Sequence, residues 1–154
     1  MSNRALFIYF LGLALIVLMA GGCGGRKGPY AKHISIRPPD QYTTLFMRIE
    51  RAFRRRDLDT TMDCFARAKC KQYGPILTYF TDLYRRGDKM SLKLYKGGVR
   101  DKPLTRTFEF RWKRAYFDIY DRCWHRTKGR AFIKVNKGEV PRILEVTGAN
   151  PFLR

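Results

Sequence analysis

The sequence is poor in acidic residues and in histidine. It has 13 Asp and Glu against 32 Lys and Arg, a net charge of +19 on 154 residues, and its only two histidines are His33 and His125. It contains no nucleophile elbow, no Gly-rich phosphate loop and no helical pair of histidines. The cysteines do not show the paired spacing of a zinc site. We therefore expect neither a metal nor a cofactor.

An uncharged apolar run near the beginning of the chain is typical of a bacterial secretory signal peptide. Arg4 precedes the run, which extends from Ala5 to Ala20 and is followed by small residues and a cysteine. The stretch "AGGC", ending at Cys23, resembles the lipobox of bacterial lipoproteins, with Ala20 where that family prefers Leu. The resemblance implies that residues 1–22 are cleaved off and that Cys23 is acylated with fatty acids such as palmitate.

Two other interpretations of this segment are open. It could be an uncleaved membrane anchor, or Cys23 could be an ordinary residue in a signal peptide that is cut elsewhere. A membrane span needs about 20 apolar residues, and the basic residues Arg26, Lys27 and Lys32 follow the run, which disfavours export of an uncleaved anchor. Two or more acyl chains hold a protein stably on a bilayer. We expect a lipid-anchored protein of the bacterial cell envelope, on the periplasmic side in a Gram-negative host.

The rest of the chain divides into a tether and one domain. Residues 23–39 are rich in Gly, Pro and basic residues and have no helical period, which indicates a flexible connection. Residues 40–154 are long enough for one core and too aromatic for a disordered chain.

The first half of the domain predicts three helices. Asp40 can cap a helix, Asp57 or Asp59 can cap a second one, and a third begins after Gly74 and Pro75 and ends with Gly87 in the left-handed position that often follows a helix. Apolar residues recur at helical spacing in each of them. The inward residues are predicted to be Leu45, Phe46, Ile49, Ala52 and Phe53, then Leu58, Met62 and Phe65, then Ile76, Leu77, Phe80, Leu83 and Tyr84.

The second half alternates between apolar and polar residues, which is typical of half-buried strands. Strands are expected around Met90–Leu94 and Phe108–Trp112, and then at Tyr116–Trp124, Arg130–Val135 and Arg142–Thr147, with turns at residues 127–129 and 136–139. We expect Phe108, Phe110 and Trp112 to pack against the third helix. Helices followed by a curved antiparallel sheet define an α+β fold with the helices on one face.

This order of elements resembles the nuclear transport factor 2-like fold, an α+β cone shared with ketosteroid isomerases and polyketide cyclases. The resemblance covers about Asp40 to Phe152 and depends on "RRRDLDTTMDCF", "YGPILTYFTDLY" and "GRAFIKVNKGEVPRILEVTGANPF". It implies a concave sheet face that holds either a substrate or a binding partner. Enzymes of this superfamily place a carboxylate general base inside the cone.

Three carboxylates are candidates for that base: Asp63, Asp118 and Glu145. Each also has an ordinary structural interpretation. Asp63 can face water, Asp118 can point outward while Phe117 and Ile119 fill the core, and Glu145 can pair with a basic side chain.

Three cysteines remain if Cys23 is acylated. Cys64 and Cys70 could form a disulfide only if the helix breaks between them, and either could instead pair with Cys123. The alternative is that all three are small buried residues.

The basic excess includes "RIERAFRRRD", where Arg48, Arg51, Arg54 and Arg55 lie opposite the apolar stripe. Lys and Arg also recur at outward positions of the predicted strands, which indicates a broad positive surface. Behind a secretory signal we expect no nucleic acid partner; anionic phospholipid, lipopolysaccharide phosphates, cell-wall carboxylates or an envelope protein fit better. The favoured hypothesis is a noncatalytic, lipid-anchored binding or scaffold domain, as in periplasmic scaffolds of type IV secretion. The alternative is a small-molecule hydrolase or isomerase with a carboxylate base in the cone.

Overall fold

The computed structural model describes residues 40–153. Three helices precede a four-stranded antiparallel sheet, which confirms the expected α+β class. The predicted signal peptide, Cys23, His33 and the tether lie outside the described residues. No described helix has the length and apolar character needed to cross a membrane. The elements are α2 Gln41–Arg55, α3 Leu58–Asp63, α4 Tyr73–Arg86, β1 Gly87–Asp101, β2 Thr105–Asp118, β3 Cys123–Asn136 and β4 Ile143–Gly148.

The first two helices begin at the predicted caps. The side chain of Asp40 accepts a hydrogen bond from the Thr43 amide at 2.6 Å, and Asp57 caps α3 by accepting from the Thr60 amide at 2.9 Å. Such bonds satisfy backbone donors that have no partner inside the helix. The whole apolar stripe predicted for α2 is buried, with Ile49 and Phe53 fully inaccessible.

The third helix, α4, differs from its prediction at both ends. It begins at Tyr73, so Gly74 and Pro75 lie in its first turn, where proline removes no hydrogen bond that the helix needs. Leu77 is 37% exposed and is not a core residue. Gly87 has an extended conformation, with φ −87° and ψ 137°, so it opens β1 directly and does not form a left-handed cap.

The sheet is a meander in the order β1-β2-β3-β4. The predicted strand Tyr116–Trp124 and the predicted turn at residues 127–129 are both wrong, because β2 and β3 pair without interruption from Thr105 opposite Asn136 to Asp118 opposite Cys123. The turn lies between them at residues 119–122. Gly129 lies within β3 opposite Trp112, and the position needs glycine because Trp112 packs on it: a Cβ atom there would be 2.9 Å from the indole ring.

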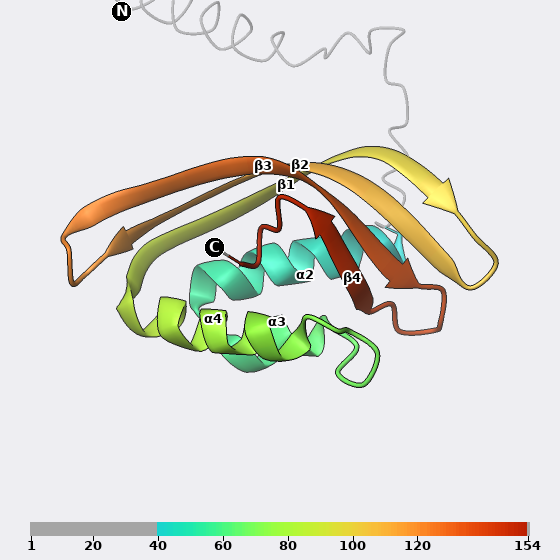
Figure 1. The fold of residues 1–154 in the computed structure, drawn as a ribbon, viewed down its shortest axis with the longest axis horizontal. Coiled ribbons are helices and arrows are strands. Elements are labelled where there is room, and N and C mark those ends of the chain that lie inside the picture. The colour runs from blue at the N-terminus through green and yellow to red at the C-terminus, as the bar shows by residue number, and fades with distance from the viewer. Residues whose placement is uncertain (1–39, 154) are drawn as a thin grey trace, which may run out of the picture. The chain divides into compact units, whose positions relative to one another are not determined.

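The sheet arches over the helices, and the core fills the space between them (Figure 1). Phe108, Phe110 and Trp112 are buried on this concave face, as predicted. Phe108 and Phe110 also pack against the first helix, which was not predicted: the ring centroid of Phe46 on α2 lies 5.1 Å from Phe108 and 4.5 Å from Phe110. The described core is contained between Tyr42 and Phe152, so the domain carries its own core.

Arg114 is buried on the concave face and holds the C-terminal end of the chain. Its guanidinium donates hydrogen bonds to the carbonyl oxygens of Pro151 and Leu153, each at 3.0 Å. It also lies over the ring of Tyr79, with 5.2 Å between the guanidinium carbon and the ring centroid. Burial lowers the pKa of Arg114. Arg114 was not among the residues predicted to face inward, although its position two residues after Trp112 indicates the inward face.

We expect Trp112→Ala to lower the free energy of unfolding by about 3 to 5 kcal/mol, as other deletions of large core side chains do. The indole is 5% exposed, and its Nε1 donates to the Ala149 carbonyl at 2.6 Å, so the variant loses both packing and a hydrogen bond. Trp124→Ala is the matched control, because Trp124 is 48% exposed. Urea unfolding measures both. Equal stability of the two variants would contradict the placement of Trp112.

Candidate functional site

Aromatic side chains fill the space under the sheet where the enzymes of this fold hold a substrate. Phe53, Phe80 and Phe108 are no more than 1% exposed, as are Phe65, Phe110 and Phe152. The ring of Phe80 lies 5.9 Å from Phe53 and 6.2 Å from Phe152, so rings from α2, α4 and the C-terminal end meet one another. Such packing leaves no room for a substrate in this part of the cone.

Asp63 and Glu145 lie outside the cone. Asp63 ends α3 and forms ion pairs of 2.7 Å with Arg48 and with Arg142. The hydrogen bond from Arg142 is the main cause that lowers the pKa of Asp63, and the bond from Arg48 acts in the same direction. A carboxylate with a lowered pKa is a weak base at neutral pH. Glu145 is exposed on β4 and pairs with Lys134 at 3.1 Å.

Asp118 is buried, so the expectation that it points outward is wrong. The inward row of β2 continues from Trp112 through Tyr116 to Asp118, which is 2% exposed, while Ile119 is 48% exposed. One carboxylate oxygen of Asp118 accepts from the Tyr120 amide at 2.9 Å, and the other lies 3.5 Å from the Arg86 guanidinium. Both oxygens are therefore engaged by the protein itself.

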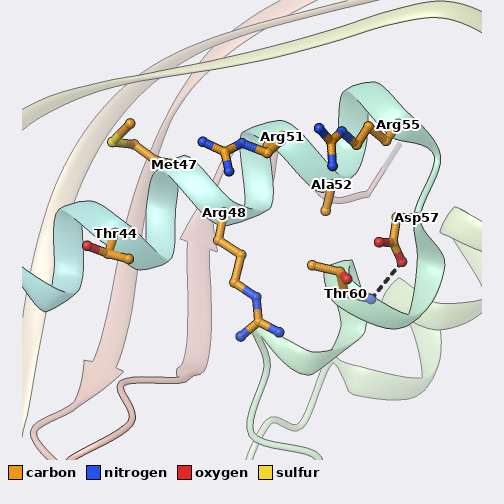
Figure 2. Close-up of a pocket in the computed structure, with 8 residues that line it drawn as sticks. All are labelled: Thr44, Met47, Arg48, Arg51, Ala52, Arg55, Asp57 and Thr60. Atoms are coloured by element: carbon orange, nitrogen blue, oxygen red, sulfur yellow. Dashed lines mark hydrogen bonds between the residues drawn. The ribbon is translucent and has the colours of Figure 1, made fainter.

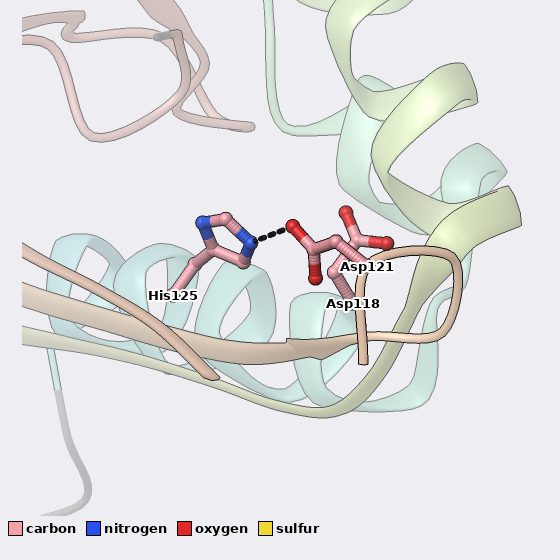
Figure 3. Close-up of side chains that lie close together, drawn as sticks. All are labelled: Asp118, Asp121 and His125. Carbon is pink, nitrogen blue, oxygen red and sulfur yellow. Dashed lines mark hydrogen bonds and ion pairs between the residues drawn. The ribbon is translucent and has the colours of Figure 1, made fainter. Parts of the chain in front are cut away.

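Asp118 belongs to a polar cluster with Asp121 and His125 at the turn between β2 and β3 (Figure 3). The Nε2 atom of His125 lies 2.7 Å from a carboxylate oxygen of Asp121, and the imidazole stacks on Tyr116 with 4.9 Å between centroids. The hydrogen bond with His125 lowers the pKa of Asp121. The three side chains could supply ligand atoms within 4.8 Å of one another. Arg86, which pairs with Asp118, already supplies a positive charge to this cluster.

Three of the four predicted arginines line a hollow between α2 and α3 (Figure 2). Arg48, Arg51 and Arg55 follow one another at intervals of three and four residues, which places them along one side of α2. Arg54 is exposed but does not line the hollow. The hollow has a volume of about 510 Å³, and its lining is completed by Thr44, Met47, Ala52, Asp57 and Thr60.

The hollow carries an excess of positive charge. The one carboxylate on its lining, Asp57, caps α3 by accepting hydrogen bonds from Thr60, and these bonds lower the pKa of Asp57. Arg48 is partly neutralised by Asp63. Arg51 and Arg55 have no ion pair among residues 40–153. Guanidinium groups present paired donors that match phosphate and carboxylate oxygens, so the hollow is chemically suited to an anion.

The three described cysteines are free. Cys64 and Cys70 are buried, whereas Cys123 is exposed, so the interpretation of three buried residues is wrong for Cys123. Burial raises the pKa of the Cys64 thiol to about 11, and its sulfur donates to the Thr60 carbonyl at 3.3 Å. No disulfide joins these three residues in the described part of the chain.

We expect one fast-reacting thiol in the folded chain from residue 24 onward. Reagents that need a thiolate should modify Cys123 within minutes and Cys64 and Cys70 only after unfolding, because burial excludes the reagent and keeps the thiols protonated. Peptide mass spectrometry after brief alkylation identifies the labelled residue. Resistance of Cys123 in the native protein, or a disulfide among the three, would contradict this arrangement.

The fold is similar to solved structures of the nuclear transport factor 2-like superfamily. One is a superfamily member from Salmonella enterica serovar Typhimurium, with a TM-score of 0.60 and 17% identity over 72% of this chain and 89% of the other. A candidate dehydratase from Streptomyces avermitilis gives 0.56 and 9% over 69% and 90%. A ketosteroid isomerase-like protein from Erwinia carotovora gives 0.52 and 6% over 70% and 93%. No protein-family model matches the chain, and no curated protein does so either.

These similarities establish the fold expected from the sequence: helices followed by a curved four-stranded sheet, in a nuclear transport factor 2-like cone. Proteins with this fold include both enzymes and binding modules, so function depends on the residues of this chain.

Proposed function

We propose that this chain is a noncatalytic, lipid-anchored binding domain of the bacterial cell envelope that holds an anionic group of a ligand or partner in the hollow between α2 and α3. The observation that carries the proposal is that Arg48, Arg51 and Arg55 line one hollow. The nearest carboxylates, Asp57 and Asp63, are already engaged in a helix cap and in ion pairs.

The filled cone supports a noncatalytic role. A general base must reach the substrate proton within about 3 Å or through one water. Of the three candidate carboxylates, Asp63 and Glu145 are paired on the outside, and Asp118 is buried against Arg86. The rings of Phe80 and Phe108 occupy the interior that such a base would serve.

The chemistry of the hollow favours a phosphate or carboxylate group. Lipopolysaccharide phosphates, phospholipid headgroups and cell-wall carboxylates all carry such groups in the envelope. Arg51 and Arg55 can each offer two parallel hydrogen bonds to one anion, and the hydroxyl groups of Thr44 and Thr60 on the lining can add further bonds.

The membrane attachment in this proposal depends on Cys23. Mass spectrometry of the protein purified from bacterial membranes should show a mature chain that begins with an acylated Cys23. A Cys23→Ser variant should lose the acyl groups and keep the uncleaved leader. An intact Met1 terminus in the parent protein, or a mature chain with unmodified Cys23, would contradict the anchor and leave the hollow unaffected.

The second candidate function is a small-molecule hydrolase or isomerase. The observation that favours it is the polar cluster at the end of the concave face, where buried Asp118 lies beside Tyr116 and close to Asp121 and His125. Structural neighbours described as a dehydratase and as ketosteroid isomerase-like point to the same class. Asp118 could act as the base in such an enzyme only if Arg86 moved away from it.

The anion proposal is tested with tripolyphosphate, a soluble and multiply charged probe. The chain from residue 24 onward should bind it in a calorimeter. Arg51→Glu combined with Arg55→Glu should weaken binding by more than about tenfold, since each charged hydrogen bond contributes about 1.5 to 3 kcal/mol. The matched control is Arg67→Glu combined with Lys71→Glu, which changes the net charge equally. Both residues are exposed and do not line the hollow.

Two outcomes would contradict the proposal. An equal loss of tripolyphosphate affinity in both double variants would show that net charge alone causes the binding. Undiminished binding by the α2 double variant would remove the hollow as the site. Unchanged unfolding midpoints are expected for both variants, because these side chains point into solvent.

A further inference from the structure

The outer face of the sheet carries a second concentration of positive charge, at strand positions where the sequence predicts basic side chains to point outward. Lys93 pairs with Lys113 across β1 and β2, and Lys113 pairs with Lys128 across β2 and β3. Three lysines therefore stand in one row across three strands. In the adjacent rows Arg111 lies opposite Arg130, and Arg126 lies opposite an alanine. All six basic residues are exposed.

Few acidic groups compensate this charge. Glu50 lies 3.9 Å from Lys93, and Glu109 pairs with Arg130. The side chains of Lys113 and Lys128 have no ion pair among residues 40–153. Like charges directly opposite each other destabilise an antiparallel sheet. The row therefore opposes folding, and a role in binding explains why the sheet contains it.

Aromatic side chains accompany the basic rows on the same face. Tyr95 is 51% exposed and Trp124 is 48% exposed. Lys113 lies over the ring of Tyr95 at 5.9 Å, and the Arg126 guanidinium lies over Trp124 at 5.8 Å. Between the rows is a hollow of about 450 Å³ lined by Lys93, Tyr95, Lys113, Arg126 and Lys128, among others. Amphipathic rings of Tyr and Trp sit favourably at the headgroup level of a bilayer.

We infer that the outer face of the sheet docks on a bilayer that contains anionic phospholipid. The basic rows contact lipid phosphates, and Tyr95 and Trp124 enter the headgroup layer. A second copy of this chain does not fit, because a symmetric pair of these faces would set Lys113 and Lys128 against the same charges. No helix of residues 40–153 covers this face, since α2, α3 and α4 all lie under the concave side (Figure 1).

The inference goes beyond the proposed binding role and gives it an orientation. With the sheet on the membrane, the α2 arginines lie on the helical side of the domain, away from the lipid, so in this orientation the anion in the hollow is not a phospholipid headgroup of the same bilayer. One face then contacts the bilayer while the hollow receives its anion. The two claims can fail separately, because the hollow is assayed with a soluble anion and the sheet with vesicles.

The test is flotation of the unacylated chain from residue 24 onward with phosphatidylglycerol–phosphatidylcholine vesicles and with pure phosphatidylcholine vesicles. We expect binding to the mixed vesicles alone, weakening as salt rises because exposed charges are screened. Lys113→Glu should reduce the affinity by about tenfold or more. The control Lys71→Glu makes the same change of charge in the connection between α3 and α4 and should retain most of the binding.

A second measurement separates lost contact from lost structure. Lys113→Glu converts the row of three lysines into a Lys–Glu–Lys row, so its unfolding midpoint should rise while vesicle binding falls. Trp124 supplies a third readout, since the other tryptophan, Trp112, is buried. On mixed vesicles the Trp124 emission should shift to shorter wavelength and be quenched by brominated lipid. The Trp124→Phe variant should show neither response.

Three results would overturn the inference. One is equal binding of the parent chain to neutral and anionic vesicles. Another is the same loss of affinity in Lys113→Glu and Lys71→Glu, which would make net charge the only cause. The third is vesicle binding with no change in Trp124 emission, which would place the contact on another face, such as the one that carries the α2 arginines.

Discussion

The contact of Phe46 with Phe108 and Phe110 joins the first helix to the centre of the sheet, and the other features depend on it. The ring of Phe46 meets each of the other two rings edge to face, with centroid distances of 5.1 Å to Phe108 and 4.5 Å to Phe110. This packing, together with the contact between α2 and β1, places the apolar stripe of α2 under the sheet and turns its arginines away from it. It also sets which face of β2 is concave, because side chains alternate strictly along a strand.

Filling the concave face with aromatic rings has a consequence for the charges. The domain contains many more basic than acidic residues, and a charged side chain cannot be buried without a partner that compensates its charge. Arg114 is the exception among the described arginines: two carbonyl oxygens of the C-terminal end and two aromatic rings compensate its charge. Two groups of the remaining basic side chains gather along α2 and across the outer face of the sheet, while others, such as Arg67 and Lys71, lie in the connection between α3 and α4.

A charged residue also covers part of the β1 edge of the sheet. Glu50 on α2 accepts a hydrogen bond from the amide of Leu94 on the edge strand β1 at 2.6 Å. An exposed strand edge invites pairing with another chain, so this bond blocks one donor of that edge. The same carboxylate lies 3.9 Å from Lys93. The first helix therefore contributes to the core, to the basic hollow and to the protection of β1.

Local patterns in the sequence determined the three helices, the cap at Asp40 and the inward row Phe108, Phe110 and Trp112, because these depend on residues close together in the chain. For the second helix they left Asp57 and Asp59 as alternative caps, and the structure has Asp57. Only the tertiary structure decided which elements meet. The alternation in β2 extends past Trp112 to Asp118, which is buried because Arg86 from α4 reaches it. Glycine is common in turns, but Gly129 lies in a strand, where the close approach of Trp112 requires a residue without a side chain. The lysine row across β1, β2 and β3 is a product of strand register, and register is set by contacts between residues far apart in the chain.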